Sequence, residues 1–244
     1  MEKLMETQLE NLGNNTFLCV SKDHTFGTDA IALAHFSAPK RNTVACDLGS
    51  GCGIIPMLFC RDGLCKSVTA VEIQKNACEQ IEKAVEINGF SHKFNVVNHD
   101  LRTLSENELP LYSFDLVTMN PPYKAPGAGI TNLTESALIA RHEVMCIFDD
   151  VTKAAAKLLK FGGRLCVCHR PERLTDVICS MRENGIEPKR IRYLVHTVGK
   201  SANLIMVEGK KGASSGVVIE PDMILRNDDG TYTEMALSMY GAYR

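Results

Sequence analysis

The sequence predicts an α/β fold in which helices flank a mainly parallel β-sheet that ends in an antiparallel pair of strands. Three observations support this fold class. Short apolar runs alternate with helical stretches along most of the chain, which is the pattern of βαβ units with right-handed crossovers. A glycine-rich loop directly follows the first apolar run of the repeating pattern. Two late apolar runs are joined without a helix, and such a short connection favours antiparallel pairing.

The elements are expected in alternating order. Strands are predicted at residues 43–47, 67–72, 94–98, 114–119 and 164–168, with helices at 54–60, 74–88 and about 144–159. We expect Gly162-Gly163 to stop the last of these helices. A further helix begins at Pro171 and ends near Gly185, because proline suits the first turn of a helix and glycine its end. The final two strands are predicted at 190–196 and 203–208.

Size and composition limit the possibilities. The chain has 244 residues, of which 45% are hydrophobic, as in a globular protein with a large core. We expect an N-terminal extension at 1–28, one main domain at 29–210, and a C-terminal extension at 211–244 packed on that domain. The formal net charge of −2 provides no global basic field for nucleic acid. Residues 141–211 hold 14 Lys and Arg against 8 Asp and Glu, which predicts either a local basic face or a solvated mixed surface.

The sequence gives no sign of a membrane, secretion or metal. Apolar runs are shorter than the ~18–20 residues of a membrane span, and the acidic start does not resemble a signal peptide. We therefore expect a cytoplasmic protein without a membrane partner. No metal is expected either, because Cys166-Val167-Cys168-His169 has no second ligand pair nearby. The ten cysteines include no C-x-x-C pair, and several in apolar runs are expected to be reduced core thiols: Cys46, Cys146, Cys166, Cys168 and Cys179.

The loop Asp47-Leu-Gly-Ser-Gly-Cys-Gly53 connects the first predicted strand of the sheet to a helix. Open α/β sheets bind ligands beyond the carboxyl ends of their strands, and glycines let a backbone approach the ligand closely. A nicotinamide dinucleotide site would need a small residue at position 54 or 56. Those positions hold Ile54 and Pro56, so that kind of site is excluded.

The spacing D-x-G-x-G-x-G resembles motif I of class I S-adenosylmethionine (SAM)-dependent methyltransferases. Two further acids fall at predicted strand ends. Glu72 can accept hydrogen bonds from both ribose hydroxyls of a nucleoside, and Asp100 can accept one from the adenine amino group. Each acid alone could simply cap a helix, but with Asp47 they indicate a nucleoside site. SAM is the expected cofactor, with contacts from Asp47, Gly49, Ser50, Gly51, Gly53, Glu72, Ile73, Asp100 and Leu101.

Asn120-Pro121-Pro122-Tyr123 follows the strand predicted at 114–119. A planar amino group is a poor nucleophile because its lone pair is delocalised. The Asn120 side-chain carbonyl and the Pro121 backbone carbonyl can accept its two N–H bonds, while the prolines fix φ and leave no competing N–H. Tyr123 offers a flat face on which a base can stack. The alternative is a proline-rich turn. The tetrapeptide resembles the (D/N/S)PP(Y/F/W) motif of amino-methyltransferases that act on adenine N6, guanine N2 or a protein glutamine amide.

Longer stretches resemble the bacterial tRNA1(Val) adenine-37 N6-methyltransferase family over residues 15–240. The stretches are TFGTDAIALAHF (25–36), ALIARHEV (137–144), FGGRLCVCHRPERL (161–174) and EPKRIRYLVHTVGKSANLIMVEG (187–209). The resemblance implies a Rossmann-like class I methyltransferase fold with a seven-stranded sheet, SAM as cofactor and RNA, specifically tRNA, as partner. A target adenine in tRNA must leave its stack to reach the site.

The resemblance also implies roles for individual residues. Thr28 and Asp29 would close over the methionine end of SAM, with Phe26 nearby; alternatively, Thr28 or Asp29 caps the following helix. Arg141 and His142 would lie near the acceptor pocket, or else form an exposed helix turn. Six basic residues are expected either to contact phosphates or to be solvated surface charges: Arg170, Arg173, Lys189, Arg190, Arg192 and Lys200.

Three function hypotheses stand beside one another. The first is an RNA adenine-N6 methyltransferase. The second is a protein-glutamine or small-molecule amino-methyltransferase, which the lack of a long N-terminal helical region for a protein partner makes less favoured. The third is a SAM-binding scaffold without transfer, against which Asn120 together with Asp47, Glu72 and Asp100 argues. The oligomeric state is not predicted.

Overall fold

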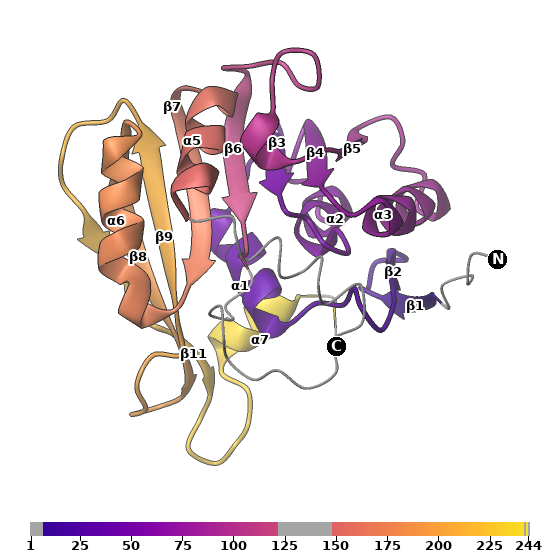
Figure 1. The fold of residues 1–244 in the computed structure, drawn as a ribbon. Helices are drawn as coiled ribbons and strands as arrows, with labels where there is room; N and C mark the ends of the chain where they lie inside the picture. The colour runs from indigo at the N-terminus through magenta and orange to yellow at the C-terminus, as the bar shows by residue number, and fades with distance from the viewer. Residues whose placement is uncertain (1–6, 122–147, 242, 244) are drawn as a thin grey trace, which may run out of the picture.

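The computed structural model describes residues 7–121, 148–241 and 243. Within these ranges a nine-stranded sheet has the order β10-β8-β9-β7-β6-β3-β4-β5, and β11 also pairs with β8 (Figure 1). The strands of this sheet are β3 (Val44–Leu48), β4 (Ser67–Glu72), β5 (Phe94–Asn98), β6 (Phe114–Met119), β7 (Leu159–His169), β8 (Ile186–Thr197), β9 (Leu204–Lys211), β10 (Val218–Ile219) and β11 (Met223–Arg226). The helices are α1 (Thr28–Ser37), α2 (Ile54–Arg61), α3 (Lys75–Ile87), α5 (Phe148–Leu158), α6 (Leu174–Glu183) and α7 (Glu234–Tyr240), with short 3-10 turns η1 (Leu101–Thr103) and η2 (Pro171–Arg173).

Strand directions confirm the predicted fold class. β3 runs parallel to both β4 and β6, β4 to β5, and β6 to β7. β9 lies antiparallel to β7 and β8, which gives the expected antiparallel final pair. These seven strands form the predicted seven-stranded sheet of Rossmann-like type. β10 and β11 lengthen it by pairing parallel to β8.

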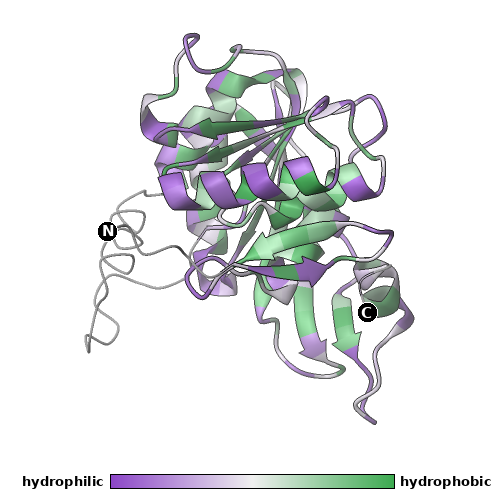
Figure 2. Ribbon diagram, turned by 90° about the vertical axis from the view of Figure 1, so that its right-hand side faces the viewer, coloured by the Kyte–Doolittle hydropathy of each residue, from purple (hydrophilic) through white to green (hydrophobic). Residues whose placement is uncertain are grey.

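Hydrophobic cores lie on both faces of the sheet. One core joins α1, α2 and α3 to the strands, and the other joins α5 and α6 to the opposite face. Neighbouring strand residues alternate between the two cores: Ala45 faces the first and Cys46 the second. Figure 2 shows the result, with largely hydrophobic strands and helices that carry hydrophilic residues on their outer sides. Burial on both faces explains why the strands read as continuous apolar runs.

Three local expectations were wrong. β7 begins at Leu159, and Gly162-Gly163 lies inside it instead of ending the preceding helix. A Cβ on Gly163 would lie 2.9 Å from the Phe114 carbonyl oxygen, so glycine permits close approach to β6. Cys179 is exposed on α6, whereas eight other described cysteines are buried thiols outside disulfides; Cys146 lies outside the described residues. The cap of α1 is Gly27, which makes neither Thr28 nor Asp29 the capping residue.

The two ends of the chain contribute elements that lie outside the βαβ pattern. β1 (Gln8–Asn11) and β2 (Phe17–Val20) form a separate antiparallel hairpin. The Asn88 amide, at the end of α3, donates to the Phe17 carbonyl at 2.6 Å and accepts from the Phe17 N–H at 2.8 Å. At the other end, α7 packs against α1 (Figure 1). The three-part division at 28 and 210 stays a prediction. No described helix is long and apolar enough to cross a membrane.

Candidate active site

The glycine loop connects β3 to α2 in a conformation that requires glycine. Gly49, Gly51 and Gly53 have φ values of 65°, 55° and 79°, in the left-handed region that side chains disfavour. A Cβ on Gly53 would also lie 2.9 Å from Ile81 Cγ1. The Ser50 N–H donates to the Val71 carbonyl at 3.1 Å, which ties the loop to β4. Sequence spacing therefore identified a loop whose backbone is set by its glycines.

Glu72 holds this loop from the end of β4. Its side chain is buried, Oε2 accepts from the Gly51 N–H at 2.8 Å, and Oε1 accepts from the Gln74 N–H at 2.9 Å. A carboxylate offers about four lone-pair sites, so this role is compatible with further hydrogen bonds from ribose hydroxyls. The neighbouring Ile73 is 41% exposed, an apolar surface at the same strand end.

Asp47 links two central strands beneath the loop. Its side chain is 2% exposed, and Oδ1 accepts a 2.5 Å hydrogen bond from the Thr118 hydroxyl, directly across the β3–β6 ladder. Burial raises the pKa of Asp47 to about 7, although the Thr118 hydrogen bond acts in the opposite direction. No cation is among the described contacts of Asp47, so a positively charged ligand nearby would favour the ionised form of this side chain.

Asn120 lies at the end of β6, next to the start of α1. Its Nδ2 donates to Asp29 Oδ2 at 2.9 Å, joining residues 91 positions apart. Because a carboxylate accepts hydrogen bonds, the nitrogen end of the Asn120 amide faces Asp29 and the Oδ1 end points elsewhere. Sequence analysis assigned the two residues to different ligands and missed this contact, since no spacing rule connects them. Pro121 follows Asn120; Pro122 and Tyr123 lie outside the described residues.

Asp100, Leu101 and Phe26 lie at the edges of this region. Asp100 caps η1: Oδ1 accepts from the Arg102 backbone N–H at 2.9 Å, and its oxygens accept from the Arg102 guanidinium. Arg102 holds the Asp100 pKa below its usual value. Leu101 packs against the α5 side of the core, and Phe26 meets Tyr243 edge to face at 5.8 Å. A contact between Asp100 and adenine therefore stays a prediction.

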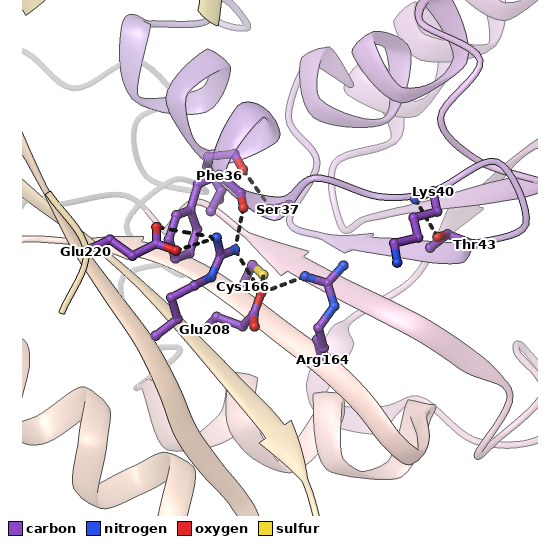
Figure 3. A network of polar contacts seen from close by, with 10 residues as sticks. Phe36, Ser37, Lys40, Thr43, Arg164, Cys166, Glu208 and Glu220 are labelled. Atoms are coloured by element: carbon purple, nitrogen blue, oxygen red, sulfur yellow. Dashed lines mark hydrogen bonds and ion pairs between the residues drawn. The ribbon is translucent and has the colours of Figure 1, made fainter. Parts of the chain in front are cut away.

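Arg190 is partly buried and pairs with two glutamates and a backbone carbonyl of the fold. One guanidinium nitrogen donates to the Phe36 carbonyl at 2.7 Å and to Glu208 at 3.0 Å, and another donates to Glu220 at 3.1 Å (Figure 3). Its Cζ lies 4.2 Å from the centre of the Phe36 ring. These contacts fix the end of α1 to the sheet, so the structure favours a packing role for Arg190.

The remaining basic candidates are spread over several elements. Arg173 pairs with Asp176 at 2.9 Å, Lys189 donates to the Ser214 carbonyl at 3.1 Å, and Arg192 donates to the Pro221 carbonyl at 2.7 Å. Arg170 and Lys200 are exposed. Arg141 and His142 fall outside the described ranges. Among described residues, no group of three or more His, Cys, Asp or Glu could hold a metal ion.

Comparison with known proteins identifies the family. Residues 21–178 match the family described as the methyltransferase small domain. The chain belongs to this family. A tRNA1(Val) (adenine(37)-N6)-methyltransferase from Tolumonas auensis is 26% identical over 209 residues, covering 85% of this chain and 84% of the relative. The membership and the fold together make this protein a SAM-dependent methyltransferase.

Solved structures agree on the fold. A crystal structure from Agrobacterium tumefaciens, described as a "predicted O-methyltransferase", superimposes with a TM-score of 0.69 at 20% identity, covering 88% of this chain and 96% of that one. The [4+2]-cyclase SpnF superimposes with a TM-score of 0.56 at 13% identity, covering 87% and 88%. Proteins with different chemistry thus share this fold, and the acceptor must be argued from the site.

The described residues fit an adenosyl donor of the kind the family uses. A Cβ built on Gly51 meets nothing within 4 Å, so the outer side of the glycine loop is open. Glu72 lies behind the loop, and the exposed Ile73 follows it on β4. An open backbone, a carboxylate and an apolar surface are what a nucleoside needs for close approach, ribose recognition and ring contact.

Proposed function

We propose that this protein transfers the methyl group of SAM to the exocyclic N6 amino group of an adenine in tRNA. The observation that carries the proposal is the Asn120–Asp29 hydrogen bond of 2.9 Å, which orients the amide of the sequence motif at the carboxyl end of the sheet. The tRNA adenine-N6 activity named for the Tolumonas relative supports the choice of acceptor.

When bound, SAM supplies a methyl group activated on a sulfonium centre. The glycine loop, Glu72 and Ile73 would bind its adenosyl part, and Asp47 would support the loop from beneath. Because these groups are set by backbone geometry and burial, the donor meets a site that needs little reorganisation.

Asn120 would hold the acceptor. With its nitrogen directed to Asp29, the amide presents Oδ1 to one N–H of the adenine amino group, and the Pro121 carbonyl accepts the other. Two acceptors favour a pyramidal nitrogen whose lone pair is directed at the methyl carbon. Transfer would join the adenine nitrogen to the methyl carbon and break the carbon–sulfur bond, with S-adenosylhomocysteine as the leaving group and one amino proton released to solvent. Catalysis is positioning combined with electrostatic stabilisation of the charge that develops on nitrogen.

The experiment is to incubate the protein with radiolabelled SAM and bulk tRNA from cells lacking the activity, then digest the RNA to nucleosides. We expect label in N6-methyladenosine, formed about 100- to 1,000-fold more slowly by Asn120→Ala. Label in another nucleoside would show that the acceptor is not adenine N6. Intact SAM binding with no label in RNA would overturn the proposal and direct the search to protein amides and small molecules.

A further inference from the structure

A cavity of about 540 Å³ lies between the start of α1 and the C-terminal extension. Its volume is within the roughly 300–1,000 Å³ of small-ligand sites. The cavity is lined by Phe26, Gly27, Thr28, Ile31, Tyr232, Leu237, Tyr240 and Tyr243. Four of these eight residues are aromatic, in a chain with only 6% aromatic residues, so the cavity concentrates flat π surfaces.

The aromatic side chains are held in place. Tyr240 contacts Tyr232 and Tyr243 with ring centres 5.5 and 6.5 Å away, and its hydroxyl hydrogen-bonds the Thr28 hydroxyl at 3.0 Å. The Tyr243 hydroxyl donates to Glu10 at 2.9 Å. Tyr232 stays 43% exposed at the rim, with the Arg226 guanidinium carbon 4.3 Å from its ring centre. A flat ligand would find preformed surfaces beside a cation.

The cavity adjoins the acceptor site. Thr28 lines it, and the next residue, Asp29, is the one bonded to Asn120. Consecutive Cα atoms are about 3.8 Å apart, so the two sites meet at adjacent residues of α1. Figure 1 shows α1 and α7 together below the end of β6. Neither Asn120 nor the glycine loop is part of the lining, so a ring in the cavity is neither the adenine that reaches Asn120 nor the adenine of the donor. The lining shares Phe26 and Thr28 with the contacts predicted for the methionine end of SAM, which carries no ring.

We propose that this aromatic cavity binds a second base of the RNA substrate, one close to the target adenosine in the strand. The proposal rests on the proposed function, since it needs an RNA acceptor. Single-stranded RNA is commonly bound by stacking unpaired bases on aromatic side chains, and cations beside such rings meet the phosphates. When the target base is flipped, its neighbours lose a stacking partner, and the tyrosines would replace it.

The test compares Tyr232→Leu with Tyr232→Phe and with the control Tyr112→Leu. Tyr112 is also an exposed tyrosine with a cation over its ring, Lys211 at 4.5 Å, but it lies outside this cavity. The probe is the unmodified tRNA transcript that accepts most methyl label. We expect Tyr232→Leu to raise the dissociation constant for this transcript about 10-fold, in line with the loss of stacking by one base. The dissociation constants of the other two variants should stay within about 2-fold of wild type. SAM affinity should be unchanged in all three.

A second measurement places the base. Transcripts carrying one abasic nucleotide at each position flanking the target are bound to wild type and to Tyr232→Leu. At one position, removing the base should weaken binding to wild type about as much as Tyr232→Leu weakens binding to the intact transcript. Removing the same base should weaken binding to Tyr232→Leu little further. Additive losses at every position, or wild-type affinity in Tyr232→Leu, would overturn the cavity proposal while RNA methylation still stands. Wild type that neither binds nor methylates RNA would overturn both.

Discussion

Helix α1 has a polar cluster at each end, and the two clusters differ in how their carboxylates are partnered. At its start, Asp29 accepts from the Asn120 amide, and Asp47 and Glu72 follow at the carboxyl ends of β3 and β4. At its end, the Phe36 carbonyl accepts from Arg190, which also pairs with Glu208.

The difference separates the proposed binding site from a contact that stabilises the fold. Glu208 lies between Arg164 at 2.6 Å and Arg190 at 3.0 Å, so its charge is matched by guanidinium groups. In the first cluster, Asp47 accepts from the Thr118 hydroxyl and Asp29 accepts from the Asn120 amide. Carboxylates with such neutral partners respond to a cationic ligand, whereas arginine-matched ones are already satisfied. Asp29 near the start of α1 is therefore a candidate for a role in ligand binding, whereas Glu208 near its end stabilises the fold.

The largest effect is expected from Asn120→Ala. Removing the oriented carbonyl should lower the rate of methyl transfer about 100- to 1,000-fold, the range for losing one group that stabilises developing charge. SAM affinity should remain nearly unchanged, because this side chain contacts the acceptor. Transfer rates and calorimetric SAM binding measure the two effects, and Asn107→Ala, an exposed asparagine, is the control. Equal losses of affinity and rate would contradict the assigned role.

Glu72→Gln should act first on the donor. An amide in place of this carboxylate directs an NH2 group at one of two backbone N–H donors, Gly51 or Gln74, which disturbs the glycine loop. Hydrogen bonds to charged groups contribute about 1.5–3 kcal/mol, so we expect SAM to bind about 10- to 100-fold more weakly by calorimetry. The matched control is Glu79→Gln, an exposed glutamate paired with Lys75. Normal SAM affinity in Glu72→Gln would show that the residue is not part of the donor site.

Arg190→Ala should affect stability and leave the chemistry intact. The change removes hydrogen bonds to Glu208, Glu220 and the Phe36 carbonyl, and we expect the free energy of unfolding to fall by about 2 kcal/mol. Urea unfolding measures this loss, with the exposed Arg173→Ala as control. The transfer rate per folded molecule should match wild type. A selective loss of RNA binding without a loss of stability would instead return Arg190 to the phosphate contacts.

Asp47 should give stability a pH dependence. An aspartate in the unfolded chain has a pKa of about 3.9, whereas burial raises that of Asp47 to about 7. Between these values the folded protein keeps a proton that the unfolded chain releases. The free energy of unfolding should therefore fall as the pH rises through this window, by at most about 1.4 kcal/mol per pH unit. Asp47→Asn should lack this contribution in urea titrations from pH 4 to 7. Parallel curves for the two proteins would contradict it.

The sequence predicted the sheet well because its strands are buried on both faces and punctuated by helices. It also predicted that the glycine loop and Glu72 lie at the same edge of the sheet, where Glu72 accepts a hydrogen bond from the Gly51 N–H. Contacts between distant positions had no such signal. Thr28 and Tyr240 meet across 212 residues, and Arg190 reaches Phe36 across 154. A basic residue in a sequence shows its charge but not its partner, so Arg190 looked like the exposed Arg170.

The most direct test of the account is the single-turnover rate of N6-methyladenosine formation by Asp29→Ala and Asp29→Asn, with SAM and tRNA saturating. Asp29 would act as a positioning residue, because its carboxylate orients the Asn120 amide that holds the acceptor. We predict that Asp29→Ala loses most of the rate, since the amide can then turn, and that Asp29→Asn, which keeps an acceptor oxygen, recovers a large part of it. Wild-type rates in both variants would contradict the claim that this contact builds the acceptor site.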